Sequence, residues 1–235
     1  MKLLALDTSS AHSSLAVIEE GEILLEYNVA SADQLSATLI PGLEFTLKSI
    51  GLALEEVDLF AISIGPGQFT GIRIGIATLK GLLLGSPRPV VPVVSLAAIA
   101  AKFTEANRPV VSLIDARRGE VYLAAYRFAG GLPVELIAPR LASPDRLPEI
   151  LTGLDEPLFA GSGADAYAPL LRERFPAGRV AYRSPFLAGE IGRIAAGEYA
   201  QGRFLTGSRD LRPLYVRLPD AKEPAPPSAD AVAPG

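Results

Sequence analysis

The stretch Gly65-Pro66-Gly67-Gln68-Phe69-Thr70-Gly71 lies between an apolar segment at 57–64 and a longer one at 72–84. Such an order predicts a buried strand, a tight turn and a helix. Backbone amides in this kind of turn can face an anion at the helix N-terminus. The glycine spacing, however, misses the dinucleotide fingerprint, and Ile72 follows Gly71 where a P-loop needs Lys. The turn is therefore more typical of close packing than of phosphate binding, and anion binding stays a lesser hypothesis.

Small residues recur every four positions along the helix that follows the turn: Gly71 and Gly75 in one row, and Ala77, Gly81 and Gly85 in another. They let another backbone approach closely, although each helical Gly costs about 1 kcal/mol relative to Ala. The rest of this helix is apolar nearly all round, so it needs cover on more than one side, and a sheet covers only one. We therefore expect a second helix, from this chain or another, against 71–85, with Arg73 and Lys80 flanking the contact.

Working outward, the same order of elements occurs twice. Strands are predicted at 3–6, 14–18 and 22–29, an amphipathic helix at 35–54, a strand at 90–94, and a helix at 96–103 with Ser95 as N-cap. The order restarts at 110–115, which parallels 3–7, and 158–163 then echoes 62–67; helical patterns follow at 164–175 and 186–199. These repeats predict a duplicated α/β fold with two lobes and mixed sheets.

The predicted division is an N-terminal lobe at 1–103, a C-terminal lobe at 104–218, and a disordered tail at 219–235 that is rich in Pro and Ala. The first hundred residues are acidic on balance, and the rest up to 218 are richer in Arg. This distribution argues against a dedicated nucleic-acid surface, which needs a basic excess. The N-terminus lacks a signal-peptide pattern, no apolar run is long enough for a membrane span, and Cys is absent, so we expect a cytoplasmic protein.

Few residues are suited to catalysis. The single His, His12, and the lack of Cys cannot supply the usual zinc ligands, and we interpret His12 as a solvated turn residue. Asp7 ends a strand, where its carboxylate could hold a hydrated metal beside phosphates or could close an Asx turn; the sequence favours neither. For Asp115 the structural interpretation is favoured, because Arg117 and Arg118 are close enough in sequence to engage its charge. The residues considered for nucleotide or anion binding are Asp7, Thr8, Gly65, Gly67 and Asp115, and no metal site is expected.

Four stretches together resemble the TsaB family, also called YeaZ: Leu4-Ala5-Leu6-Asp7-Thr8-Ser9, the glycine turn continued through Ile72-Arg73-Ile74-Gly75, Val94-Ser95-Leu96-Ala97-Ala98-Ile99-Ala100, and Asp115-Ala116-Arg117-Arg118-Gly119-Glu120-Val121-Tyr122. The similarity extends to Pro213-Leu214-Tyr215-Val216-Arg217. Two positions depart from the family pattern: Gln68 stands where Ser is common, and Leu35 where His is frequent.

The resemblance implies an actin/Hsp70-like (ASKHA, ribonuclease H-like) fold and a bacterial role in making threonylcarbamoyladenosine beside the anticodon of tRNA. It implies a non-catalytic subunit, without a cofactor of its own, that pairs with the transferase TsaD and is joined by the ATPase TsaE. Self-association, and ATP or ADP at the partner interface, are also compatible with it, whereas tRNA would be contacted through the complex. A stand-alone ATPase or phosphotransferase using Asp7 and Asp115 is the alternative.

The resemblance also implies that pairing uses the helix at 35–54 and the helix after the glycine turn. The residues expected to contact the partner are Leu39, Leu43, Leu47, Gly71, Ile72, Arg73, Gly75, Ile76, Leu79, Lys80 and Gly81.

Overall fold

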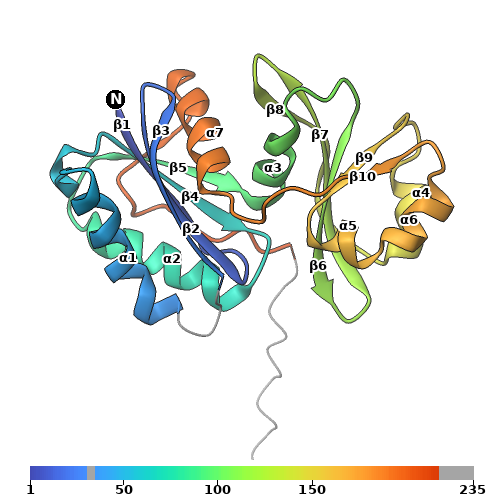
Figure 1. The fold of residues 1–235 in the computed structure, drawn as a ribbon, viewed down its shortest axis with the longest axis horizontal. Helices are drawn as coiled ribbons and strands as arrows, with labels where there is room; N and C mark the ends of the chain where they lie inside the picture. Colours follow the sequence, from blue (N-terminus) through green and yellow to red (C-terminus); the bar gives the residue numbers. More distant parts are fainter. Residues whose placement is uncertain (31–34, 217–235) are drawn as a thin grey trace, which may run out of the picture.

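The computed structural model describes residues 1–30 and 35–216, which fold into two lobes that each contain one mixed sheet (Figure 1). The tail expected at 219–235 lies outside the described residues. The first sheet has the order β11-β5-β4-β1-β2-β3. Its strands are β1 (Lys2–Asp7), β2 (His12–Glu19), β3 (Glu22–Ala30), β4 (Leu59–Gly65), β5 (Pro89–Val94) and β11 (Leu205–Thr206).

The second sheet has the order β10-β9-β6-β7-β8 and repeats the arrangement of the first. Its strands are β6 (Val110–Arg117), β7 (Glu120–Ala129), β8 (Leu132–Ala142), β9 (Leu158–Ala160) and β10 (Arg179–Val180). Strand β1 pairs antiparallel with β2 and parallel with β4, and β6 pairs in the same way with β7 and β9. The predicted duplication and the predicted mixed sheets are confirmed.

Two helices, α1 (Leu35–Ser49) and α2 (Phe69–Leu82), cover one face of the first sheet and share a buried core with β1, β2 and β4. The helix expected at 35–54 ends at Ser49, and a separate 3-10 turn forms at Leu54–Glu56. Helix α2 begins at Phe69 rather than at Ile72. None of the helices in the described ranges has the length and apolar content needed to cross a bilayer.

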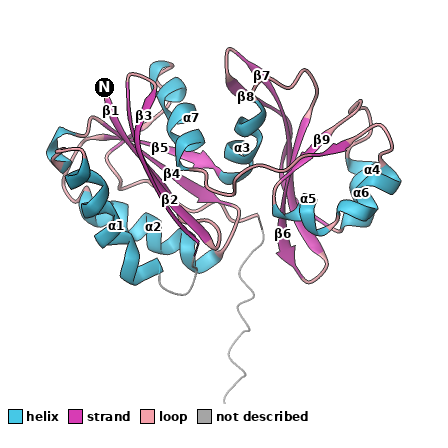
Figure 2. Cartoon of the chain, in the orientation of Figure 1, coloured by secondary structure: helices cyan, strands magenta, loops and turns pink. Residues whose placement is uncertain are grey.

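The other face of the first sheet is covered by α7 (Ala188–Ala200), which lies next to α3 (Ser95–Ala100) between the two sheets (Figure 2). A continuous buried core runs from β1 and β4 through both helices to β6 and β7. Helix α3 was expected at 96–103 with Ser95 as N-cap. Instead Ser95 is its first helical residue with a buried, unpaired hydroxyl among the described residues, and a 3-10 turn follows at Ala101–Phe103.

The outer side of the second lobe carries short helices: α4 (Leu147–Ile150), preceded by a 3-10 turn at Pro144–Arg146, α5 (Ser162–Ala166) and α6 (Ala168–Arg174). Residues 110–180 form this lobe's sheet, but the chain after it returns to the first sheet, where α7 packs and β11 pairs with β5. The predicted boundary near 103 therefore separates the two sheets, whereas 188–214 belong in space to the first lobe and not to a C-terminal lobe at 104–218.

The return of α7 depends on two features of the first sheet. A Cβ atom on Gly192 would lie 2.2 Å from the terminal methyl group of Ile18, so glycine lets α7 lie close to the sheet without moving that side chain. The hydroxyl of Ser14 in β2 accepts hydrogen bonds from the backbone amides of Leu187 (3.2 Å) and Ala188 (3.0 Å). Ser14 thus satisfies amides at the start of α7 from a distant part of the chain.

Candidate functional site: the glycine turn, helices α1 and α2, and the interlobe cleft

The glycine turn packs tightly against the loop after β1. The amide of Gln68 donates to the carbonyl oxygen of Ser9 at 2.7 Å, and a Cβ on Gly67 would lie 2.1 Å from that same oxygen. Gly65 is enclosed by Ile72 and by the backbone of Leu214, has a φ of 107°, and precedes Pro66 in a cis peptide bond. The turn therefore fixes the approach of α2 to β1, which supports the packing interpretation.

The first row of small residues in α2 continues this contact. A Cβ on Gly71 would lie 2.2 Å from the Thr8 carbonyl oxygen, and one on Gly75 would lie 2.2 Å from the Thr8 hydroxyl oxygen. The expectation that Gly71 and Gly75 contact a partner subunit is therefore corrected: the backbone of Thr8 in this chain approaches Gly71, and the Thr8 side chain approaches Gly75. Gly81, in the second row, has no atom within 4 Å of its Cβ position and is exposed.

Asp7 is fully buried at the end of β1. One carboxylate oxygen, Oδ1, accepts hydrogen bonds from the amide of Ser9 (2.9 Å) and the hydroxyl of Ser63 (2.5 Å), while Oδ2 has no hydrogen-bond partner among the described residues. Burial raises the pKa of Asp7 above its ordinary 3.8, although these hydrogen bonds oppose the shift. The carboxyl group forms the Asx turn that was one of two interpretations, and it is shielded from solvent.

Replacing Asp7 with Asn should reduce the loss of stability as pH rises. Because the folded state of the wild type binds this proton more tightly than the unfolded state, Asp7 favours folding most below pH 3.8. That contribution is lost as pH rises through the folded pKa, and Asn removes the effect. The free energy of unfolding, measured with urea, should decrease less between pH 4 and pH 8 for Asp7→Asn than for the wild type. The exposed Asp155→Asn, with the same change of charge, is the control, and equal slopes for all three proteins would contradict the prediction.

Asp115 repeats the local geometry of Asp7 at the end of β6 but stays accessible, with 28% of its side chain exposed. It accepts a hydrogen bond from the amide of Arg117 at 2.9 Å and lies 3.8 Å from that residue's guanidinium group. Both contacts agree with a structural role for Asp115. Gly67 and Asp115 line one hollow of about 300 Å³ between the lobes, whereas Asp7, Thr8 and Gly65 are buried and do not line it. The five residues considered for anion binding thus do not form a single accessible site.

Most of the apolar residues expected at a partner interface point into this chain's own core. The buried ones are Leu39, Leu43, Leu47, Ile72, Ile76 and Leu79. These side chains of α1 and α2 face the first sheet, so they cannot contact a partner in this conformation. The expectation that they form the partner interface is corrected. The remaining two expected residues, Arg73 and Lys80, hold the segment 208–215, which we call the C-terminal strap.

The C-terminal strap runs along α2 and β4. The Nε of Arg73 donates to the hydroxyl of Tyr215 at 2.9 Å, and its guanidinium carbon lies 3.7 Å from the centre of the Phe69 ring. The Nζ of Lys80 donates to the carbonyl oxygen of Arg209 at 3.3 Å, and the amide of Leu214 donates to Ile64 at 2.8 Å. Arg73 and Lys80 therefore stabilise the strap on α2.

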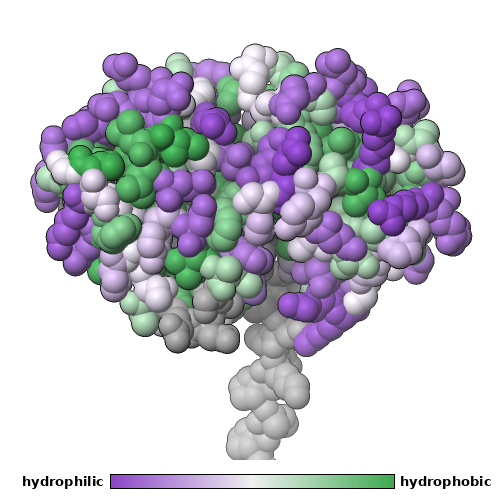
Figure 3. All heavy atoms as spheres, in the orientation of Figure 1, coloured by the Kyte–Doolittle hydropathy of each residue, from purple (hydrophilic) through white to green (hydrophobic). Residues whose placement is uncertain are grey.

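The outward sides of α1 and α2 still expose apolar and small residues. We call this surface the α1/α2 flank and define it by Ile40, Phe45, Ala77, Gly81 and Leu84. The side chains of Ile40, Phe45 and Leu84 are 41%, 58% and 89% exposed. Figure 3 shows apolar surface on the half of the molecule that contains α1 and β3. Sequence reasoning missed Ile40 and Phe45, although their offset from the leucine stripe of the same helix marks them as outward-facing.

His12 is not a solvated turn residue, as was expected, but the first residue of β2, and it is half-buried. Its ring meets Phe186 edge-on, with ring centres 5.6 Å apart. It lines both the hollow beside Asp115 and a second hollow further along the cleft. The β2 strand extends to His12 because residues 12–19 pair with β3 along their whole length.

Comparisons with known proteins agree with this geometry. The family model of TsaD, the tRNA N6-adenosine threonylcarbamoyltransferase, matches residues 29–167. The tRNA threonylcarbamoyladenosine biosynthesis protein TsaB of Haemophilus influenzae is 30% identical over 92% of this chain and 94% of its own. The chain belongs to the TsaB family. The solved structure of YeaZ from Pseudomonas aeruginosa, 30% identical, superposes with a TM-score of 0.79 over 91% of this chain and 99% of that one.

The fold of this chain is also similar to that of a more distant protein. The activator of 2-hydroxyisocaproyl-CoA dehydratase from Clostridium difficile, solved with ADPNP, has a TM-score of 0.51 at 10% identity, over 86% of this chain and 97% of that one. At this identity the similarity concerns the fold alone. The actin/Hsp70-like fold expected from the sequence is confirmed.

Proposed function

We propose that this TsaB-family protein is a non-catalytic, cytoplasmic subunit that pairs with TsaD and activates it in the threonylcarbamoyladenosine modification of tRNA. The observation that carries the proposal is the α1/α2 flank, where Phe45 is exposed on α1 and Leu84 just after the end of α2, while the other sides of both helices are already packed. Exposed apolar residues on adjacent helices are typical of a helix-to-helix interface. The same flank serves the homodimer when the partner is absent.

The remaining parts of the assembly follow from the same proposal. TsaE joins the pair, and tRNA is contacted through the complex and not by this chain alone. The subunit has no cofactor of its own, and ATP or ADP binds at the partner interface. Asp7 supports the non-catalytic role, because a buried carboxyl group that already accepts two hydrogen bonds is poorly placed to hold a metal beside phosphates.

The alternative, a stand-alone ATPase or phosphotransferase of the same fold, requires Asp7 and Asp115 to act together on a bound nucleotide. The burial of Asp7 and the ion pair of Asp115 with Arg117 argue against it. Isothermal titration of the isolated chain with Mg-ATP tests this alternative directly. Tight binding together with turnover would favour the phosphotransferase.

Reconstitution of tRNA modification tests the leading proposal. Purified TsaD and TsaE, given the threonylcarbamoyl donor and tRNA, should form little threonylcarbamoyladenosine without this chain, and at least about 10-fold more when it is added. The chain should also co-purify with TsaD. Full modification without the chain would overturn the proposal, and modification by the chain alone would show that it is catalytic.

A further inference from the structure

The interlobe cleft contains a second hollow, of about 230 Å³, that the pairing proposal does not use. Its apolar lining comes from both lobes and includes Ile99, Phe103, Ile114, Ala160 and Leu187. A cavity of about 150 Å³ lined by apolar side chains already admits benzene, whereas pockets for drug-sized ligands begin at about 300 Å³. The hollow therefore has room for one flat ring with one small substituent.

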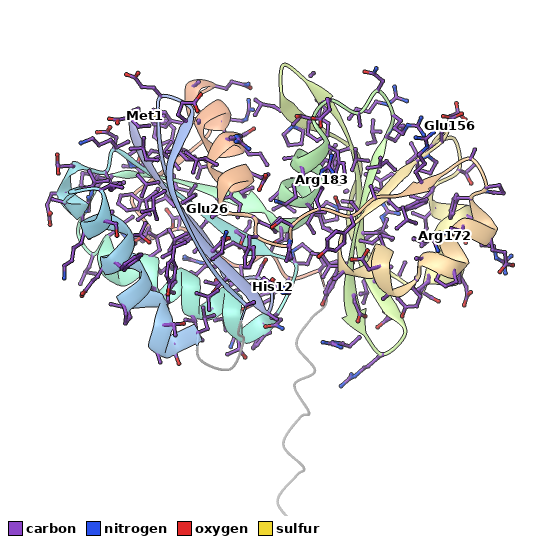
Figure 4. The ribbon with its side chains drawn as sticks, in the orientation of Figure 1. Met1, His12, Glu26, Glu156, Arg172 and Arg183 are labelled. Atoms are coloured by element: carbon purple, nitrogen blue, oxygen red, sulfur yellow. The ribbon has the colours of Figure 1, made fainter. Side chains whose placement is uncertain are left out.

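One positive group on the rim of this hollow forms no ion pair in the part of the chain that the structure describes. The Nζ of Lys102 lies 3.0 Å from the carboxylate of Glu190, and both side chains are nearly buried, so these two charges balance each other. Arg183, also on the rim, is exposed. The charge of Glu105 acts on it from a distance, but no carboxylate among the described residues forms an ion pair with it. Its guanidinium carbon lies 5.3 Å from the centre of the Phe103 ring, which holds the cation beside the apolar lining (Figure 4).

Two further groups on the rim suit a flat ligand that carries a negative charge. Tyr182 lines the hollow with 72% of its side chain exposed, which leaves an aromatic face available for stacking. The lining also contains the carboxylate of Asp165, which repels an anion, so the bound charge must lie at Arg183 and away from Asp165. The hydroxyl groups of Ser162 and Ser184, which accept backbone hydrogen bonds, keep their own protons available as hydrogen-bond donors.

We propose that this hollow binds a small organic anion, a single apolar ring bearing one carboxylate or phosphate group, with the ring against Phe103 and Ile99 and the charge on Arg183. The apolar lining provides the burial of the ring, and the guanidinium group pairs with the oxyanion in two parallel hydrogen bonds. Neither part suffices alone, because burial of the ring gives no preference for a negative charge and Arg183 is exposed to competing water.

A titration of the isotope-labelled full chain with benzoate, followed by the shifts of backbone amide NMR signals, tests the proposal. Benzoate should give saturable shifts at Ile99, Ser162 and Arg183. Acetate, which has the charge without the ring, and benzyl alcohol, which has the ring without the charge, should each bind at least about 10-fold more weakly. If acetate or benzyl alcohol bound as tightly as benzoate, the proposal would be overturned.

Two variants and one control locate the binding site. Arg183→Gln should weaken the binding of benzoate about 10-fold, because a charge-assisted hydrogen bond is lost. Ala181→Leu fills the hollow from its rim and leaves Arg183 in place. It should also weaken the binding of benzoate. Arg172→Gln removes another exposed guanidinium group, from α6 on the outer side of the lobe (Figure 4), and should leave binding unchanged. Equal affinities for Arg183→Gln and Arg172→Gln would exclude the assigned site.

Discussion

Replacing Gly71 with Ala should destabilise the protein by about 3 kcal/mol, a large share of the stability of a domain of this size. The added methyl group would lie 2.2 Å from the carbonyl oxygen of Thr8, a distance at which α2 or the loop after β1 must move. Neither can move freely, because the amide of Gln68 is bound to Ser9 in the same loop and Ile72 and Ile76 are buried in the core. The midpoint of urea unfolding measures this effect.

Gly81→Ala provides the matched control, because it introduces the same methyl group into the same helix. No atom lies within 4 Å of the Cβ position of Gly81, so the substitution only removes the backbone freedom of glycine and should stabilise the protein by about 0.5 kcal/mol. Opposite signs for the two variants would show that the first row of small residues packs within the chain. A neutral Gly71→Ala would contradict this assignment and restore the interpretation of Gly71 as an interface residue.

The order of strands and helices could be predicted because each half of the chain carries its own local signals. The segments 3–7 and 110–115 are short apolar runs that end in Asp, and each is followed by a strand and later by a glycine turn. Such signals lie within a few residues of one another, so they predict β1 and β6 with their antiparallel partners. The pairing registers observed for the two halves confirm that reasoning.

Contacts between distant segments could not be predicted in this way. Nothing near Ser14 in the sequence indicates that its hydroxyl binds the amides at the start of α7, and nothing near Arg73 indicates Tyr215. The close packing of α7 on the first sheet includes the contact of Gly192 with Ile18, and such a contact is a property of two surfaces and not of one segment.

The assignment of the leucine stripe of α1 failed for a related reason. Apolar residues at helical spacing indicate that a face is buried, but the pattern is the same whether the cover is the chain's own sheet or another subunit. Leu39 and Leu43 are covered by the first sheet, and the outward residues Ile40 and Phe45 remain for a partner. Solvent exposure, which only the structure gives, distinguishes these two sets.

Substituting Asp for both Ile40 and Phe45 should weaken binding to TsaD about 100-fold, if the α1/α2 flank is the pairing surface. Two exposed apolar side chains would be replaced by carboxylates, which resist transfer from water into an apolar interface. Central apolar residues of an interface commonly contribute about 2 kcal/mol or more each, so 100-fold is a conservative expectation. Both residues are exposed, so the thermal unfolding of the isolated variant should stay close to wild type.

Val134→Asp is the control for this double variant. Val134 is 47% exposed on β8 of the other lobe, so it undergoes the same apolar-to-acidic change at similar exposure but far from α1. Affinity for TsaD, measured by surface plasmon resonance, should be unchanged by Val134→Asp and reduced by the Ile40 and Phe45 pair. Equal losses in both variants would indicate a general effect of negative charge, and no loss in either would place the pairing surface elsewhere on the chain. Gly81→Ala, which adds only a methyl group to the same flank, should reduce affinity less than the two carboxylates do, because it introduces no charge into the interface.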